Sequence, residues 1–221
     1  MDAKTLIACR VAQELKDGDV VNLGIGLPTM VPDFLPAGTQ ITLQSENGFL
    51  GLGPLSGDPL PNLVNAGGKA CGMVPGTAFF DSATSFAIIR GGHVDLTVLG
   101  GLQVDEEANL ANWMVPGRMV PGMGGAMDLV TGAKNVIVAM EHTTRDGGAK
   151  ILKRCELPLT AAGKVSAIAT ELAFFRFIDG QLTLTETAPG VSVETIRAKT
   201  EADFVVSPDC REMRLSECVA Q

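Results

Sequence analysis

The residues best suited to chemistry in this sequence are a carboxylate and its small and amide-bearing neighbours. Glu46 follows an apolar segment, in the stretch Leu-Gln-Ser-Glu-Asn-Gly-Phe-Leu-Gly at 43–51. Ser45 and Asn47 can hydrogen-bond the carboxylate and orient it, and Gly48 lets a substrate approach the backbone. A carboxylate set in this way can attack a carbonyl carbon as a nucleophile. The alternative is that Glu46 only caps the following loop, and the spacing alone favours neither interpretation.

A second candidate is the glycine-rich stretch Gly-Met-Gly-Gly-Ala-Met-Asp-Leu-Val at 122–130. The consecutive Gly124 and Gly125 expose backbone N–H groups that no side chain shields. One such donor, aimed at a developing oxyanion, contributes roughly 3 kcal/mol to stabilising a transition state. The alternative is a plain turn into a helix, with Asp128 compensating the helix dipole.

Other common site patterns are missing from the sequence. The glycine clusters at 24–29, 51–56 and 122–127 lack the last glycine of a dinucleotide-binding motif, and no phosphate-binding G-x-x-x-x-G-K-[ST] occurs. With His93 and His142 as its two histidines, the chain has no H-E-x-x-H, and it has no G-x-S-x-G. These absences argue against a nucleotide site, a zinc site and a serine hydrolase, and we expect both histidines to be structural.

Length, composition and charge indicate how many domains the chain forms, which partners it binds and in which compartment it works. The 221 residues fit one domain over 1–221, and 46% hydrophobic against 19% charged residues suggests apolar surface that a partner covers. A net charge of −8 argues against nucleic acid. No run is long enough to span a membrane, and the N-terminus lacks the apolar core of a signal peptide. Five cysteines without a C-x-x-C pair indicate reduced thiols, so we expect a cytoplasmic protein, with Cys9 and Cys71 in its core.

Apolar runs and helical patterns alternate along the chain, which predicts an open three-layer α/β/α domain with a mostly parallel sheet. The Gly- and Pro-rich segment 48–62 is expected to be a long loop, and 209–221 a loose polar tail. Asp179-Gly180 is typical of a type I′ turn within the strand and hairpin of 165–186. Helices are expected at 4–16, 27–35 (broken by Pro32), 84–92 and 192–200 (Ser192 as N-cap), and further strands at 20–26, 40–46, 94–104, 135–141 and 203–207.

The carboxyl ends of parallel strands are where open α/β sheets bind ligands, and Glu46 follows such a strand. Asn22, Gly24 and Gly26 follow another strand and are candidates for a neighbouring cleft wall. Glu186, just before Ala-Pro-Gly, is a candidate for an acidic neighbour, although an exposed strand-end glutamate is the more ordinary interpretation.

Together these motifs resemble the beta subunit of the family I coenzyme A transferases. The stretch 43–51 is similar throughout to the family's active-site signature, in which the glutamate is the nucleophile. The likeness is strongest to the branch that acts on acetate or butyrate and acetoacetate, and 3-oxoacid and 3-oxoadipate enzymes share the same Ser-Glu-Asn-Gly. It extends through the segments 17–29, 51–54, 64–117, 120–134 and 175–190.

The resemblance implies an enzyme with covalent catalysis by Glu46, in short-chain fatty acid or ketone body metabolism. It implies Gly125, or alternatively Gly124, as the oxyanion donor, and Ser45 and Asn47 as residues that orient the carboxylate. Coenzyme A is then a substrate, and no tightly bound cofactor or metal is expected.

The resemblance also implies a partner. Because the chain lacks a G-G-F-x-x-x-G-x-P motif, it resembles half of an enzyme that pairs with an alpha subunit, as a heterotetramer with two of each. The substrates are acyl-CoA and short-chain carboxylic or 3-oxo acids, but acetate, butyrate, succinate and 3-oxoadipate all stay open. Arg118 is either a reader of a dicarboxylate or a solvated surface charge. A thioester hydrolase, a ligand sensor of the same fold and a non-catalytic structural subunit are the remaining alternatives.

Overall fold

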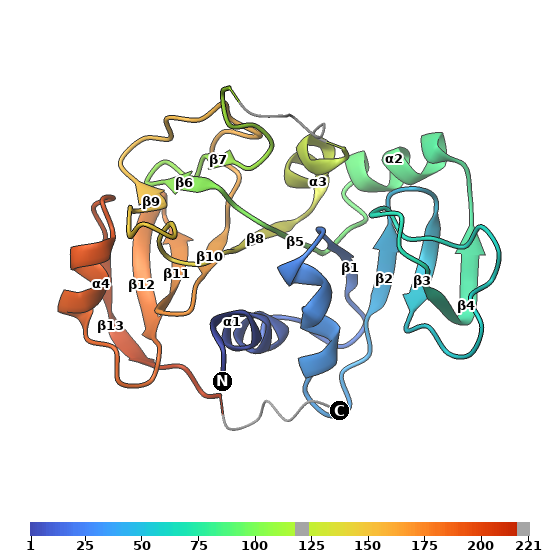
Figure 1. Cartoon of the computed structure of the whole chain (residues 1–221), viewed down its shortest axis with the longest axis horizontal. Coiled ribbons are helices and arrows are strands. Elements are labelled where there is room, and N and C mark those ends of the chain that lie inside the picture. Colours follow the sequence, from blue (N-terminus) through green and yellow to red (C-terminus); the bar gives the residue numbers. More distant parts are fainter. Residues whose placement is uncertain (118–123, 216–221) are drawn as a thin grey trace.

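The computed structural model describes residues 1–117 and 124–215. Their strands form a ten-stranded sheet in the order β13-β12-β11-β10-β8-β5-β1-β2-β3-β4 (Figure 1), and a three-stranded sheet in the order β7-β6-β9. The five central strands of the large sheet, from β10 to β2, pair in parallel, as predicted. The bounds are β1 Val20–Leu23, β2 Thr42–Ser45, β3 Phe49–Gly53, β4 Gly72–Phe79, β5 Leu96–Leu99, β6 Gln103–Asp105, β7 Leu110–Ala111, β8 Asn135–Ala139, β9 Ile151–Leu152, β10 Ala167–Ala169, β11 Ala173–Ile178, β12 Gln181–Thr187 and β13 Val205–Glu212.

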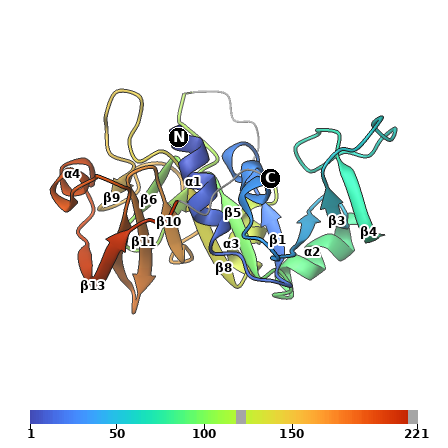
Figure 2. The ribbon, with the colours of Figure 1, turned by 90° about the horizontal axis from the view of Figure 1, so that it is seen from below.

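Helices cover both faces of the large sheet and complete the predicted α/β/α layers. The α1 helix (Ala3–Ala12) and the 3-10 helix η1 (Leu27–Phe34) enclose one apolar core with the sheet. On the other face, α2 (Ser82–Arg90), α3 (Ala126–Gly132) and α4 (Val193–Lys199) enclose a second core. Figures 1 and 2 show β3 and β4 at one end of the sheet and β13 at the other.

Local signals predicted several elements correctly. Asp179 and Gly180 both have positive φ, 51° and 78°, between the paired strands β11 and β12, so the predicted turn is confirmed. The Ser192 side chain accepts a hydrogen bond from the Thr195 N–H at 3.2 Å, so the predicted N-cap of α4 is also confirmed. The expected break at Pro32 is wrong, because Pro32 lies inside η1, where its missing N–H removes only one i→i+3 hydrogen bond.

Four other expectations about elements are wrong. The first helix ends at Ala12, where i→i−3 hydrogen bonds such as Glu14 N–H to Val11 C=O, 2.9 Å, replace helical ones. The first residues of the expected loop 48–62 form the strand β3, and the strand β4 was not predicted. Both segments are rich in glycine, which gives no strand signal in the sequence. The expected strand 94–104 divides into β5 and β6. Part of the expected loose tail, 209–212, belongs to β13, and 216–221 lie outside the described residues.

Cys9 and Cys71 are buried, as predicted. Cys71, Cys155 and Cys210 are free thiols, whereas Cys9 is disulfide-bonded, so the prediction of reduced thiols is wrong for that residue. Within 1–117 and 124–215, no helix has the length and apolar character that crossing a membrane requires.

Candidate active site

Glu46 lies in the tight turn that joins β2 to β3. Ser45 pairs with Phe49, which leaves Glu46, Asn47 and Gly48 as the turn, and the Gly48 N–H donates to the Ser45 carbonyl at 3.0 Å. Gly48 has φ 126°, and a Cβ there would lie only 2.3 Å from the carbonyl oxygen of Phe80. Glycine is therefore required at this position, and the turn presents Glu46 at the carboxyl edge of the central strands.

Ser45 and Asn47 hold the turn against the following chain. The Ser45 hydroxyl donates to Asn47 Oδ1 at 2.6 Å and accepts from the Ala66 N–H at 3.1 Å. Asn47 Nδ2 donates to the Val64 carbonyl at 2.8 Å. Both side chains thus fix the backbone that carries Glu46, whereas the hydrogen bonds to the carboxylate come from other residues.

The predicted glycines meet the glutamate. The Gly125 N–H donates to Glu46 Oε1 at 3.3 Å, although 79 positions separate the two residues. A Cβ at Gly125 would lie 3.1 Å from both Cδ and Oε1 of Glu46. Gly124 has φ 52°, and a Cβ there would lie 3.7 Å from the same oxygen. The backbone of this pair therefore forms the wall against which the carboxylate rests.

Asn22 on β1, the strand beside β2, is the other group near the carboxylate. Burial raises the pKa of the Glu46 carboxyl, while hydrogen bonding from the Gly125 N–H and the Asn22 side chain lowers it, and the net pKa is above its ordinary value. Among residues 1–117 and 124–215, the groups that lower this pKa are a backbone N–H and a side-chain amide, so the carboxylate keeps its basicity.

The other predicted wall residues, Gly24 and Gly26, also follow β1. The Gly24 N–H donates to the Val98 carbonyl at 2.8 Å, and a Cβ there would meet that oxygen at 3.1 Å. Gly26 has φ 88° and precedes η1. Both glycines therefore lie at the same edge of the sheet as Glu46. Ile25, which lies between them, is 71% exposed.

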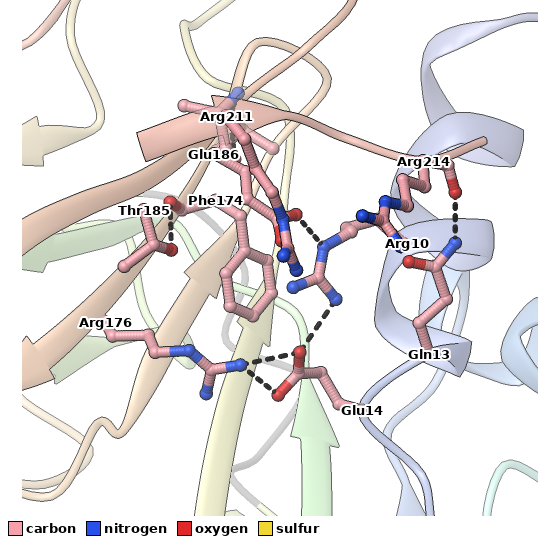
Figure 3. Close-up of polar contacts among 11 residues, drawn as sticks. Arg10, Gln13, Glu14, Phe174, Arg176, Thr185, Glu186, Arg211 and Arg214 are labelled. Atoms are coloured by element: carbon pink, nitrogen blue, oxygen red, sulfur yellow. Dashed lines mark hydrogen bonds and ion pairs between the residues drawn. The ribbon is translucent and has the colours of Figure 1, made fainter. Parts of the chain in front are cut away.

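Glu186 does not belong to this site, so its prediction as an acidic neighbour is wrong. It lies on β12, six strands from β2, a separation on the order of 25–30 Å at the usual strand spacing. Nor is it an exposed strand-end residue, because it is 6% exposed and pairs with Arg10 and Arg211 (Figure 3). Sequence reasoning placed it at a strand end but had no means of ordering the strands.

Two further predictions concern single side chains. His142 is fully buried, with Nδ1 2.9 Å from the Thr170 hydroxyl and Nε2 2.9 Å from the Thr200 hydroxyl, so its structural assignment is confirmed. Arg118 lies outside the described residues.

The sequence analysis missed two buried polar residues next to the site, Gln44 and Ser85. Gln44 Oε1 accepts from Asn22 Nδ2 at 2.6 Å, and Gln44 Nε2 donates to the Ser85 hydroxyl at 3.0 Å. The available signal was an amide within the otherwise apolar strand Ile-Thr-Leu-Gln, since buried polar residues need partners.

Fold and site define an α/β protein with one partly buried carboxylate at the carboxyl edge of its parallel strands. The chain belongs to the coenzyme A transferase family, whose model matches residues 4–199, and the members of that family are transferases. It is 68% identical to the beta subunit of the acetate CoA-transferase of Escherichia coli (strain K12) over 214 residues, 97% of this chain and 99% of that protein.

Two other comparisons, one of sequence and one of structure, show lower identity. The chain is 52% identical to one subunit of the succinyl-CoA:3-ketoacid coenzyme A transferase of Helicobacter pylori, over 89% of this chain and 96% of that protein. The crystal structure of an acyl-CoA transferase from Escherichia coli O157:H7 superposes with a TM-score of 0.80 at 22% identity. This chain covers 45% of that longer chain, and at such low identity the match shows the fold alone.

Proposed function

We propose that this chain is the beta, glutamate-bearing subunit of an enzyme that moves coenzyme A between a short-chain acyl-CoA and a 3-oxo acid such as acetoacetate. The observation that carries the proposal is the Glu46 carboxylate, held in a rigid hairpin turn against the Gly125 N–H. The 68% identity to the beta subunit of an acetate CoA-transferase supports acetate as one of the acids.

In the first half of the proposed reaction, Glu46 attacks the thioester carbonyl of an acyl-CoA. The C–S bond breaks, the CoA thiolate leaves, and a mixed acyl-glutamyl anhydride remains. The thiolate then attacks the glutamyl carbonyl, which gives a glutamyl-CoA thioester and releases the carboxylate of the first acid. The incoming acid reverses both steps, so the thioester energy is kept and the reaction needs neither ATP nor a metal.

The position of Gly125 suggests which oxyanion it stabilises. We take Oε2 as the attacking atom, so that Oε1, which already accepts from this N–H, becomes the glutamyl carbonyl oxygen after acylation. When the thiolate attacks that carbonyl, negative charge develops on an oxygen within reach of this N–H. A preformed backbone donor is effective there, because it needs no reorganisation as the charge appears.

We also propose an alpha subunit as partner, with coenzyme A and short-chain acids as substrates. Apolar surface near the hairpin supports a covering subunit, since Phe79 is 59% and Ile25 71% exposed. Residues 54–80 carry only Asp58 and Lys69 as charges. Val64 and Leu60 are also exposed, and the Val64 backbone binds Asn47 directly. An assembly of two alpha and two beta subunits in the cytoplasm completes the proposal.

A second candidate is transfer from succinyl-CoA to a 3-oxo acid. The 52% identity to the Helicobacter pylori protein favours it, and the shared family makes the same covalent chemistry available. The two candidates differ in the second carboxylate of succinate, which needs a cation to bind it. Acid acceptors with one and with two carboxylates therefore distinguish them.

The test co-expresses the chain with an alpha subunit and measures transfer from acetoacetyl-CoA to acetate, butyrate and succinate. Borohydride added with acyl-CoA is expected to inactivate the enzyme by reducing a glutamyl thioester at residue 46, with no inactivation in the absence of acyl-CoA. A label on another residue, or on the alpha subunit, contradicts the proposal. Loss of CoA ester without any acid acceptor identifies a hydrolase instead.

A further inference from the structure

A small hairpin, residues 63–71, lies against the turn that carries Glu46. Its two arms meet in a bridge between Val64 and Ala70, and it lies outside the named strands of both sheets. Apart from Cys71, its residues are exposed or half-buried. A hairpin this small and this exposed has little stability of its own, so it needs other contacts to hold one conformation.

One side chain, Asn65, shapes the tip of this hairpin. Asn65 Oδ1 accepts from the Gly67 N–H at 3.0 Å and from the Lys69 N–H at 3.1 Å. The main-chain carbonyl of Asn65 accepts from the Gly68 N–H at 2.9 Å. Since main-chain N–H groups only donate, the side-chain atom that they meet must be the amide oxygen. Three successive N–H groups are thus turned toward Asn65, and the Ala66 N–H is left for a contact outside the hairpin.

The Ala66 N–H donates to the Ser45 hydroxyl at 3.1 Å, and this contact closes a ring of hydrogen bonds. The Ser45 hydroxyl donates to Asn47 Oδ1 at 2.6 Å, and Asn47 Nδ2 donates to the Val64 carbonyl at 2.8 Å. Because the Val64 oxygen can only accept and the Ala66 N–H can only donate, the direction of every bond in the ring is fixed. Ser45 and Asn47 are the chain neighbours of Glu46, so the ring holds the backbone on both sides of the glutamate.

We propose that Asn65 is a positioning residue for Glu46. It sets the tip of the 63–71 hairpin so that the Ala66 N–H holds Ser45, and Ser45 in turn holds the turn that carries the nucleophile. Among the described residues, the side-chain hydrogen bonds of Asn65 stay within its own hairpin, so its effect on Glu46 passes through Ala66 and Ser45. The proposal rests on the function proposed above and extends it to a residue outside the β2–β3 turn.

Glu46 is sensitive to small shifts of its turn, because its hydrogen bond to Gly125 is already long. The Gly125 nitrogen lies 3.3 Å from Glu46 Oε1, against about 2.7–3.2 Å for an ordinary N–H···O hydrogen bond. A shift of the turn away from Gly125 weakens this contact further. A catalytic group misplaced by about 1 Å can cost on the order of 10²-fold in rate. The hydrogen bonds that fix the backbone at Ser45 therefore control the aim of the carboxylate.

A second small hairpin supplies the matched control. Residues 143–149 are also closed by a bridge, and at their tip the Thr144 hydroxyl accepts from the Gly148 N–H at 2.8 Å. Thr144 is exposed, and no hydrogen bond among the described residues joins this hairpin to residues 45–47. Thr144→Ala therefore removes a tip-shaping oxygen from a comparable hairpin without touching the ring at Ser45.

The experiment compares Asn65→Ala, Asn65→Asp and Thr144→Ala in the complex with the alpha subunit, by the rate of CoA transfer. We expect Asn65→Ala to lower kcat about 10- to 100-fold, as misplacement of a catalytic group does. Asn65→Asp keeps an acceptor oxygen at the same place and should recover most of the activity. Thr144→Ala should match the wild type.

A double-mutant cycle with Ser45→Ala tests the route from Asn65 to Glu46. If Asn65 acts through Ser45, the double variant loses no more kcat than Ser45→Ala alone, because the Ala66 N–H then has no hydroxyl to hold. Losses that multiply in the double variant overturn the route.

Wild-type kcat in a folded Asn65→Ala overturns the inference, and so does an equal loss in Thr144→Ala. If Asn65→Ala does not fold, Asn65→Gln decides, because it moves the amide oxygen by one methylene; wild-type kcat in that variant overturns the inference. Failure of the proposed function looks different: the wild-type complex then shows no transfer and no reduction at Glu46.

Discussion

Two parts of the molecule hold half-buried glutamates, and the pKa of the carboxyl group is shifted in opposite directions in the two. At the hairpin, the described groups that lower the pKa of Glu46 are a backbone N–H and an amide, and burial leaves that pKa raised. At the contact between α1 and the strands β11 to β13, Glu14 is also buried, and burial again raises its pKa, but Arg10 and Arg176 outweigh that effect and leave the pKa lowered. The difference lies in the cations, since burial is the largest single cause at both sites.

The ion-pair cluster, defined as Arg10, Glu14, Arg176, Glu186 and Arg211, is structural (Figure 3). Arg10 is 4% exposed, pairs with Glu186, lies 2.8 Å from Glu14, and stacks 3.9 Å from the centre of the Phe174 ring. Arg176 Nη2 binds Glu14 at 2.6 Å, and Arg211 Nη2 binds Glu186 at 3.2 Å. Carboxylates neutralised this closely are poor nucleophiles, whereas the carboxylate of Glu46 stays available.

The strongest test of this contrast removes Glu46, the proposed nucleophile. Glu46→Ala is expected to reduce transfer by on the order of 10⁴-fold or more, as removal of other enzymic nucleophiles does. Its thermal unfolding should stay near the wild type, because a partly buried carboxylate whose pKa is raised contributes little stability. Transfer assays and calorimetry of the complex check both, and retained turnover removes Glu46 from the mechanism.

The next test alters the donor. Gly125→Ala places a Cβ about 3.1 Å from the Glu46 carboxyl and pushes that group away from the backbone N–H. We expect a loss of about 10²- to 10³-fold in kcat, the usual effect of disrupting an oxyanion donor. Gly100→Ala is the matched control, since a Cβ there meets nothing within 4 Å. Equal activities in the two variants would contradict the assignment.

In the ion-pair cluster the large effect should appear in stability. Arg10→Met leaves Glu186 buried beside one remaining partner, and breaking a buried pair in this way costs about 3–5 kcal/mol. Arg90→Met is the control, because Arg90 pairs with Asp128 at an exposed site, where a pair contributes only about 0–1 kcal/mol. Chemical denaturation measures the free energy of unfolding of both variants. A similar cost in the two would show that the buried cluster stabilises the fold no more than an exposed ion pair does.

The smallest effect expected is a difference in pH dependence. The folded-state pKa of Glu14 is lowered, so its contribution to stability is present above the unfolded-state pKa and is lost as pH falls through the folded value. The folded-state pKa of Glu46 is raised, so protonation of this group favours the folded state. Glu46→Gln should therefore stabilise the protein slightly at neutral pH and not at acid pH. Unfolding curves across that range check the sign, and a loss of stability at neutral pH contradicts it.

How far the sequence predicts this protein depends on whether a feature is local. The type I′ turn at Asp179-Gly180 and the Ser192 cap depend on neighbouring residues, and both are confirmed. The strand β4 was not foreseen, because it pairs with distant chain, Phe79 with Phe49. The strand β3 was missed although it pairs with β2 across a tight turn, because its sequence is rich in glycine. Glu186 shows the same limit for side chains, since its partner Arg10 lies 176 positions away.

By itself the sequence determined the family and the layered α/β class, and it singled out the carboxylate proposed to react, because each depends on short contiguous motifs. Only the tertiary structure decided which group meets that carboxylate: the Gly125 N–H reaches Glu46 across 79 positions. It also decided that Ser45 and Asn47 support the turn, and that Gln44 links Asn22 to Ser85. The physical reason is that hydrogen bonds of about 3 Å depend on the order and register of strands, which no single stretch of sequence specifies.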